Sequence, residues 1–150
     1  MKKYVLLLVA MALLFVSCSA PKNVHNDKSQ NTVTSEIKTG LDAGNKAPDF
    51  SLKALDGSEV KLSDYENKIV VLNFFGVWCP WCKKEMPGFV KVYNDYKDKG
   101  VELLVVDSGD TEEELKDYLK EQGFGINPVL DVKGSISALY EVRGFPTTYI

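Results

Sequence analysis

The sequence predicts an α/β domain organised around a strand, a helix and a second strand. Residues 69–75 are an apolar, β-branched run with the length of a strand buried on both faces, and residues 101–106 are a second such run. Between them, residues 80–99 place large apolar side chains on or near one face of a helix. This order predicts parallel strands that are joined by a right-handed crossover.

Length and composition predict a single globular domain. The chain has 150 residues, of which 45% are hydrophobic and 26% charged, and these are ordinary values for one folded core. The formal net charge is -3, and no Lys/Arg patch is interleaved with aromatic residues. Nucleic acid is therefore not an expected partner.

Residues 1–20 have the pattern of an export signal, in which Lys2 and Lys3 precede an apolar stretch and a group of small residues. The apolar stretch is shorter than the roughly 20 residues that a spanning helix needs, so an uncleaved membrane anchor is the alternative. The run Phe-Val-Ser-Cys at 15–18 is similar to a bacterial lipobox, with Phe in place of the usual Leu. It predicts that Cys18 is lipidated at the bacterial extracytoplasmic face, unless this cysteine is discarded with the signal.

Residues 21–44 are polar and predict a flexible tether, and residues 45–150 are expected to form the domain. The domain opens with a predicted β-hairpin, because residues 50–52 alternate as in a strand and Asp56-Gly57 is a turn signal before a second strand at 60–62. Whether the chain is held by a lipidated Cys18 or by an uncleaved membrane anchor, we expect this domain to work outside the cytoplasm, where disulfides persist.

The second half of the domain carries further helix and strand signals. Thr111 and Glu114 form a capping box that opens a helix, and Gly123 ends it. A short strand near 129–130 and a helix at 135–140 are expected to follow.

Two cysteines lie where the first buried strand meets the helix. Gly76 ends the strand and Pro80 fits the first helical position, which places Cys79 at or near the N-cap and Cys82 about one turn further along. A helix N-terminus favours the thiolate over the thiol, so Cys79 is the predicted nucleophile. Cys82 is within disulfide reach, and such a pair can attack a partner's disulfide and then resolve the mixed disulfide.

Other uses of the two thiols fit the sequence less well. A purely structural disulfide would close too short a loop to constrain the unfolded chain strongly. A zinc site or a Cys-His hydrolase would need further ligands, but the domain has no third cysteine, and the only histidine, His25, lies upstream. A non-catalytic binding module would need unreactive thiols, and it stays open as an alternative.

The chain resembles the thioredoxin superfamily, and most closely its TlpA/ResA-like branch of exported thiol-disulfide oxidoreductases. The matching blocks lie, in order, at residues 47–52, 73–75, 78–85, 128–131 and 144–148. The resemblance implies a thioredoxin-like fold with an N-terminal β-hairpin, a central αβ insertion and no bound cofactor. The family continues with another strand and helix beyond Ile150, so these two elements are expected to be missing from this sequence.

The same resemblance implies that the partners are protein thiols and disulfides, together with a membrane electron donor for the protein's own disulfide. The branch leans towards reduction, often of cytochrome c precursors, although the residues between the cysteines do not set a redox direction. Family members place a cis proline beside the two cysteines, and an ordinary trans proline is the alternative. The residues expected to border the substrate groove are Trp78, Pro80, Trp81, Phe145 and Pro146.

Proton transfer is expected to involve Glu85. Thioredoxins typically have a buried Asp under the active site, but this strand carries Asn73 at the similar position, and an amide cannot accept a proton at working pH. Glu85 lies three residues after Cys82 on the same helix face, and the resembling branch has a functional Glu at this offset. The alternative is that Glu85 is an ordinary solvated helix residue.

A peroxiredoxin-like peroxidase with antioxidant activity is the remaining enzymatic alternative. Such proteins share the Ala-Pro-Asp-Phe motif found at residues 47–50. Their reactive cysteine usually has a Thr three residues before it, whereas this chain has Gly76 there.

Overall fold

The computed structural model describes residues 38–150 of the chain. The predicted signal, Cys18 and the first part of the predicted tether lie outside the described residues. Residues 38–46 form a hydrogen-bonded loop, in which the Lys46 N–H donates to the Lys38 carbonyl at 2.8 Å and the Gly40 N–H donates to the Lys46 carbonyl at 3.0 Å. Leu41 in this loop packs against buried residues of the domain.

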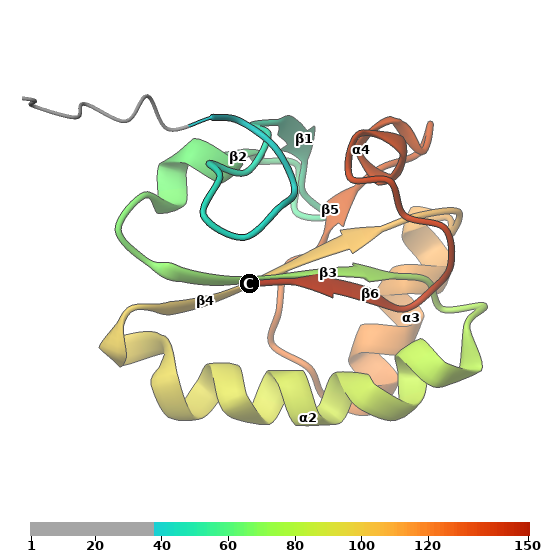
Figure 1. Ribbon diagram of the computed structural model, residues 1–150. Helices are drawn as coiled ribbons and strands as arrows, with labels where there is room; N and C mark the ends of the chain where they lie inside the picture. Colours follow the sequence, from blue (N-terminus) through green and yellow to red (C-terminus); the bar gives the residue numbers. More distant parts are fainter. Residues whose placement is uncertain (1–37) are drawn as a thin grey trace, which may run out of the picture. The chain divides into compact units, whose positions relative to one another are not determined.

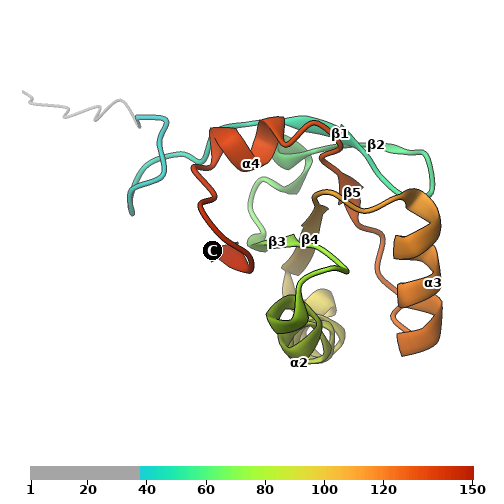
Figure 2. The same ribbon diagram turned by 90° about the vertical axis from the view of Figure 1, so that its right-hand side faces the viewer.

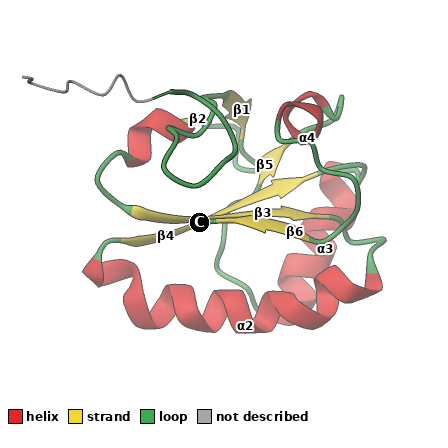
Figure 3. Cartoon of the chain, viewed as in Figure 1, coloured by secondary structure: helices red, strands yellow, loops and turns green. Residues whose placement is uncertain are grey.

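A four-stranded sheet is the central layer, with the strand order β5-β4-β3-β6 (Figure 3). β3 (Ile69–Phe75) and β4 (Val101–Asp107) are parallel and pair along their whole length. β5 (Val129–Leu130) adds in parallel to β4, and β6 (Thr147–Tyr149) adds antiparallel to β3. The predicted strand–helix–strand unit is therefore confirmed, and it occupies the middle of the sheet.

α2 (Pro80–Tyr96) and α3 (Glu112–Gln122) cover one face of this sheet (Figures 1 and 2). A short 3₁₀ turn, η2 (Lys97–Lys99), follows α2, so the long predicted helix ends in a tighter turn. We call the buried side chains between these helices and the sheet the helix-side core; they are Phe75, Cys79, Cys82, Met86, Val90, Leu103, Val105, Leu115, Tyr118, Leu119 and Leu130.

The opposite face is covered by a hairpin and by the short helix α4 (Ser135–Leu139) (Figure 2). The hairpin consists of β1 (Ser51–Lys53) and β2 (Glu59–Lys61), and the 3₁₀ turn η1 (Leu62–Tyr65) follows it. The hairpin-side core comprises the buried residues Phe50, Ala54, Leu72, Phe74, Leu104, Val106, Val129 and Tyr140. Alternate residues of β3 and β4 therefore point into opposite cores, which explains why both strands read as continuous apolar runs.

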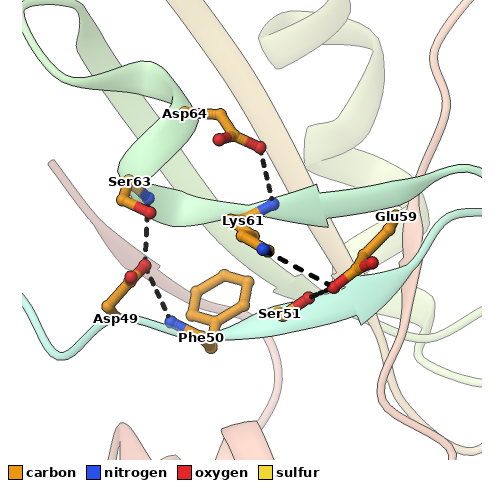
Figure 4. A network of polar contacts seen from close by, with 7 residues as sticks. All are labelled: Asp49, Phe50, Ser51, Glu59, Lys61, Ser63 and Asp64. Carbon is orange, nitrogen blue, oxygen red and sulfur yellow. Dashed lines mark hydrogen bonds and ion pairs between the residues drawn. The ribbon is translucent and has the colours of Figure 1, made fainter.

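Side-chain hydrogen bonds hold the hairpin in place, as Figure 4 shows. The Asp49 carboxylate accepts from the backbone N–H groups of Phe50 and Ser63, at 3.0 and 2.9 Å. Across the hairpin, the Ser51 hydroxyl donates to Glu59 at 2.6 Å. Asp49 thus ties the start of β1 to the turn that follows β2, and the predicted hairpin is confirmed.

α3 has both predicted end signals. The Thr111 hydroxyl accepts from the Glu114 N–H at 3.2 Å, while the Glu114 carboxylate accepts from the Thr111 N–H at 2.9 Å. Gly123 ends the helix in a left-handed conformation with φ 66°, which a glycine adopts at low cost. Leu115, Tyr118 and Leu119 of this helix enter the helix-side core, so the capping box fixes the helix that covers this face.

No helix within residues 38–150 is long and apolar enough to cross a membrane. A hollow of about 420 Å³ lies between the loop at 40–47, η1 and the side chains of Tyr140 and Tyr149. Its sheet residues, Val70 and Leu72, pack with the hairpin-side core. This hollow is therefore separate from the face that carries the two cysteines.

Candidate active site

The turn between β3 and α2 places Cys79 at the N-cap of α2. Pro80 occupies the first turn of the helix, where its missing N–H costs no hydrogen bond. The Cys82 N–H donates to the Cys79 sulfur at 3.2 Å, and the Cys79 N–H donates to the Gly76 carbonyl at 3.0 Å. The predicted cap is confirmed, and it presents the Cys79 sulfur to the positive end of the helix.

Cys79 and Cys82 are joined by a disulfide, with 5.3 Å between their Cα atoms. Cys79 is 3% exposed and Cys82 is fully buried, and both belong to the helix-side core. A partner would therefore meet the Cys79 side of the bond, because Cys82 lies on the core side.

Two exposed tryptophans flank the disulfide. Trp78 is 56% exposed and Trp81 is 66% exposed, and exposed aromatic surface of this size is typical of a contact site. The Trp78 indole donates to the Ser108 carbonyl at 2.9 Å, and its ring centre lies 5.2 Å from that of Phe145. A Cβ built on Gly76 would come within 2.7 Å of the Trp78 ring, so only glycine fits beneath the indole as it is placed here.

The Phe145-Pro146 peptide bond is cis, as the resemblance implied. β6 follows directly and pairs antiparallel to β3, with Thr147 opposite Phe74. Because the two strands run in opposite directions, Phe145 and Pro146 lie towards the carboxyl end of β3, where the turn that carries the cysteines begins. Phe145 packs against both cores.

A small hollow of about 280 Å³ adjoins this group of aromatic side chains. Its lining combines Phe145 and the exposed Val132 with Ser108 and Ser137. The hydroxyls of Ser108 and Ser137 are 2.9 Å apart and buried. The hollow thus combines two large apolar side chains with a buried pair of hydroxyl groups.

Asn73 is completely buried in β3 and connects three elements. Its amide nitrogen donates to the Glu85 carboxylate on α2 at 3.0 Å and to the Thr148 hydroxyl on β6 at 3.0 Å. Its amide oxygen is buried without a hydrogen-bond partner. Glu85 is half-buried and reaches inwards to Asn73, so it is not an ordinary solvated helix residue.

Two carboxylic acids lie near the active-site turn, Asp107 at the end of β4 and Asp110 in the loop that follows. The Asp110 carboxylate accepts from the Val77 N–H, and Asp107 lies opposite Phe75 at the end of the parallel pair. Burial raises the pKa of Asp107 to about 8, and the hydrogen bond and negative charge of Asp110 add to this rise. Sequence reasoning missed both residues, and their place after a buried parallel strand was the only signal that could have indicated them.

The sequence-predicted site residues of the domain come together at one end of the sheet. Trp78, Cys79, Pro80, Trp81 and Cys82 lie at the start of α2, and the Trp78–Phe145 contact joins them to the cis proline loop. Thr148, which the sequence analysis did not single out, completes the Asn73–Glu85 contact. A disulfide at a helix N-terminus beside a cis proline defines the class of the thioredoxin-fold thiol-disulfide oxidoreductases, and this protein is an enzyme of that class.

Comparison with known proteins agrees with this class. The model of the AhpC/TSA family matches residues 43–150. The thiol-disulfide oxidoreductase ResA of Bacillus thuringiensis subsp. konkukian is 34% identical over 144 residues, which are 96% of this chain and 80% of that protein. ResA of Bacillus cereus (strain ATCC 10987) is 33% identical over 150 residues, which are 100% of this chain and 83% of that protein.

Solved structures show the same fold. The thioredoxin domain of a thiol-disulfide oxidoreductase from Bacteroides vulgatus matches with a TM-score of 0.65 and 34% identity, over 73% of this chain and 80% of that one. A thiol:disulfide interchange protein from Bacteroides sp. matches with a TM-score of 0.62 and 34% identity, over 68% of this chain and 69% of that one. The chain belongs to the AhpC/TSA family, and its relatives include the thiol-disulfide oxidoreductases named ResA.

Proposed function

We propose that this protein is a membrane-tethered, extracytoplasmic oxidoreductase that reduces protein disulfides with Cys79 and Cys82. The observation that carries the proposal is the disulfide at the N-terminus of α2, with Cys82 buried and exposed aromatic side chains around Cys79. In the reduced protein, the helix N-terminus favours the Cys79 thiolate. Burial keeps Cys82 away from solvent until a mixed disulfide has formed.

The reaction then follows thiol–disulfide exchange. The Cys79 thiolate attacks one sulfur of the substrate disulfide, forms a mixed disulfide and releases the other substrate sulfur as a thiolate, which takes a proton from water. Cys82 loses its proton and attacks the Cys79 sulfur, which releases the second substrate thiolate. Two electrons pass to the substrate, and the enzyme keeps the Cys79–Cys82 disulfide.

Glu85 is the proposed acceptor of the Cys82 proton. It lies three residues after Cys82 on α2, and the Asn73 amide holds its carboxylate on the inward side of the helix. Asn73 itself cannot take the proton, because an amide does not titrate in this range. Its role would be to orient Glu85, together with the hydroxyl of Thr148.

The proposed substrate groove lies between Trp78, Trp81, Phe145 and Pro146. Trp78 and Phe145 contact each other across the opening next to the disulfide. Backbone groups beside a proline at this position are free to pair with an extended substrate chain, and the exposed indole of Trp81 would cover apolar side chains of that chain. Pro80 shapes the same edge as the first residue of α2.

The proposed location rests on the sequence of residues 1–44, of which the structure describes only residues 38–44. An export signal at 1–20, a lipidated Cys18 and a tether at 21–44 would hold the domain at the bacterial extracytoplasmic face of a membrane. A membrane dithiol protein would return two electrons to the Cys79–Cys82 disulfide. Disulfides of cytochrome c precursors are the substrates that we propose to test first, because the resemblance points to them.

Peroxide reduction is the enzymatic alternative, and the site geometry does not favour it. The residue three before Cys79 is Gly76, and any side chain there would meet the Trp78 ring. A peroxide-consumption assay with the reduced full chain separates the two activities. We expect reduction of insulin disulfides and no consumption of hydrogen peroxide above that of the protein without both cysteines.

Trapping of mixed disulfides tests the proposed order of attack. Cys82→Ser leaves the nucleophile but removes the resolving thiol, so we expect this variant to accumulate mixed disulfides with substrate proteins. Cys79→Ser is the matched control and should accumulate none, because Cys82 is buried. The measurement is non-reducing electrophoresis after acid quenching, and equal trapping by both variants would refute the assignment.

A further inference from the structure

Asp107 is a buried carboxylic acid at the edge of the sheet where the active-site turn begins. It is 2% exposed, and one of its carboxyl oxygens has no hydrogen-bond partner. Leu103 and Val105 of the same strand enter the helix-side core, so Asp107, two residues further on, points to the same face. Its backbone neighbour across the sheet is Phe75, which packs with the two cysteines. The acid therefore lies on the redox face of the sheet, although the reaction described above does not use it.

The loop after Asp107 holds the active-site turn through its backbone and its side chain. The Asp110 carboxylate accepts from the Val77 N–H, and the Ser108 carbonyl accepts from the Trp78 indole at 2.9 Å. Gly109 adopts φ +96°, and a Cβ there would lie 3.2 Å from the indole nitrogen. Val77 and Trp78 immediately precede Cys79, so this loop determines where the turn lies.

The neighbouring charges that raise the pKa of Asp107 are those of acidic residues. Asp110 on the loop hydrogen-bonds to Asp107 and repels its charge, and Glu114 on α3 adds a weaker repulsion. On the β5 side, the Asp131 N–H donates to the Asp107 carbonyl at 2.8 Å, while the Asp131 carboxylate accepts from Ile136 and Ser137 instead. The backbone N–H of Asp110, by contrast, hydrogen-bonds to the Asp107 carboxyl group and lowers its pKa. Burial and this surrounding charge hold the pKa of Asp107 at about 8, so at neutral pH it carries a proton that it can donate to Asp110.

A metal ion is not the reason for this pair of acids. Within residues 38–150, no group of three or more His, Cys, Asp or Glu side chains is arranged to hold one. A shared proton satisfies the two carboxyl groups without any ligand, because a protonated acid donates to a neighbouring carboxylate and removes one of the two charges.

We propose that Asp107 and Asp110 are positioning residues that share one proton, and that this proton keeps the Val77–Cys79 turn in the geometry that disulfide exchange requires. The inference rests on the redox role proposed above for Cys79. When the proton leaves to solvent, two adjacent carboxylates repel each other. Asp110, which is half-buried on the loop, moves away from Asp107 and no longer accepts from the Val77 N–H. Attack by Cys79 then slows at alkaline pH, although more of its thiol is ionised.

A titration of the oxidised full chain tests the shared proton directly. Carbon-13 NMR of the aspartate carboxyl groups should show one residue that titrates near pH 8, and its signal should be absent in Asp107→Asn. Asp110→Asn removes the neighbouring negative charge, so it should lower that pKa. A spectrum in which every aspartate has titrated by about pH 6 would overturn the proposal, whether or not either variant folds.

The effect on the reaction is measured with the reduced full chain and 5,5′-dithiobis(2-nitrobenzoic acid) between pH 6.5 and 9.5. The rate of attack by wild type should rise with thiol ionisation and then fall above pH 8. The rate of attack by Asp107→Asn should instead rise to a plateau and stay there. Asp117→Asn, an exposed change on α3, is the matched control and should follow wild type. Coincident profiles for wild type and Asp107→Asn would overturn the positioning role. Failure of wild type to reduce insulin disulfides at pH 7 would instead refute the redox function, and the carboxyl titration would still decide the shared proton.

Discussion

Asn73 links the redox strand β3 by hydrogen bonds to α2, the helix that carries the cysteines, and to β6. A buried amide without partners would destabilise the fold, and here its nitrogen is satisfied by Glu85 and Thr148. The arrangement places an uncharged amide in the core and keeps the carboxylate of Glu85 half-buried beside it.

We predict that Glu85→Gln slows the second step of exchange and leaves the first unchanged. Glutamine keeps an oxygen that can accept from Asn73, so the fold should persist, but it cannot take the proton from Cys82. General-base catalysis typically contributes about 10² to 10⁴-fold, so we expect resolution of the mixed disulfide to slow by about 10²-fold or more. Stopped-flow measurement of the rate at which the reduced substrate is released from the mixed disulfide, between pH 5 and 9, checks this prediction.

The matched control for that variant is Glu113→Gln, which changes an exposed glutamate on α3. It should reproduce the wild-type pH profile. If the profile of Glu85→Gln also superimposes on wild type, Glu85 does not accept the proton, and its contact with Asn73 is only structural.

At the scale of elements, the N-terminus of a helix has a different role in α2 and in α3. In α2 the N-cap is a cysteine, so the group that accepts from the backbone is also the reactive sulfur. In α3 the N-cap is Thr111 within a complete capping box. The first cap therefore serves the chemistry, while the second stabilises a helix that covers the core around the disulfide.

Thr111→Ala should destabilise the protein by about 1 kcal/mol, because it removes the side-chain oxygen that caps α3. Thr111→Ser keeps that oxygen, and because Ser is at least as good an N-cap as Thr, it should leave the stability close to that of wild type. Urea unfolding of the oxidised protein, followed by circular dichroism, measures both. We expect the rate of insulin reduction to stay at the wild-type value, since the cap does not contact the cysteines.

The contribution of this capping box should also depend on pH. Hydrogen bonds from the backbone and side chain of Thr111 lower the pKa of Glu114 from its ordinary value of 4.5. A carboxyl group with a lowered pKa stabilises the fold above its ordinary pKa, and this stabilisation is lost as the pH falls through the lowered value. The difference between wild type and Thr111→Ala should therefore shrink in acid, and a constant difference down to pH 2 would contradict this account.

At the scale of the whole molecule, the two faces of the sheet carry different tasks. The helix-side core contains the disulfide, Phe75 and the residues of α2 and α3 that support it. The hairpin-side core joins the hairpin, α4 and Leu41 of the loop at 38–46, which includes the last residues of the predicted tether. The two cysteines therefore lie on the face of the sheet opposite this loop.

Cys18→Ala should release the protein from membranes or block its processing, because lipidation requires that thiol. The measurement is the membrane fraction after ultracentrifugation of cells that express the full chain. Cys79→Ser is the control, since it removes a cysteine within the domain and should stay in the membrane fraction. An unchanged membrane fraction for Cys18→Ala would favour an uncleaved helix as the anchor.

The sequence alone determined the elements of this domain and the chemical nature of its reactive pair. The buried strands, the hairpin turn at Gly57, the Cys79 cap and the Thr111 capping box were all predicted correctly. Each depends on residues within a few positions of one another, because periodicity, turn conformation and helix capping are local properties of the backbone. Even the cis bond before Pro146 was expected, because a short motif of the family carries it.

Only the tertiary structure decided which side chains from distant segments meet at the site. Asn73 and Thr148 are 75 residues apart in the chain, and Val77 and Asp110 are 33 apart. Their contacts depend on β6 joining β3 and on the loop after β4 folding over the active-site turn. The unusual pKa of Asp107 has the same origin, since a carboxyl group titrates normally until packing removes its water and brings a second carboxyl group beside it.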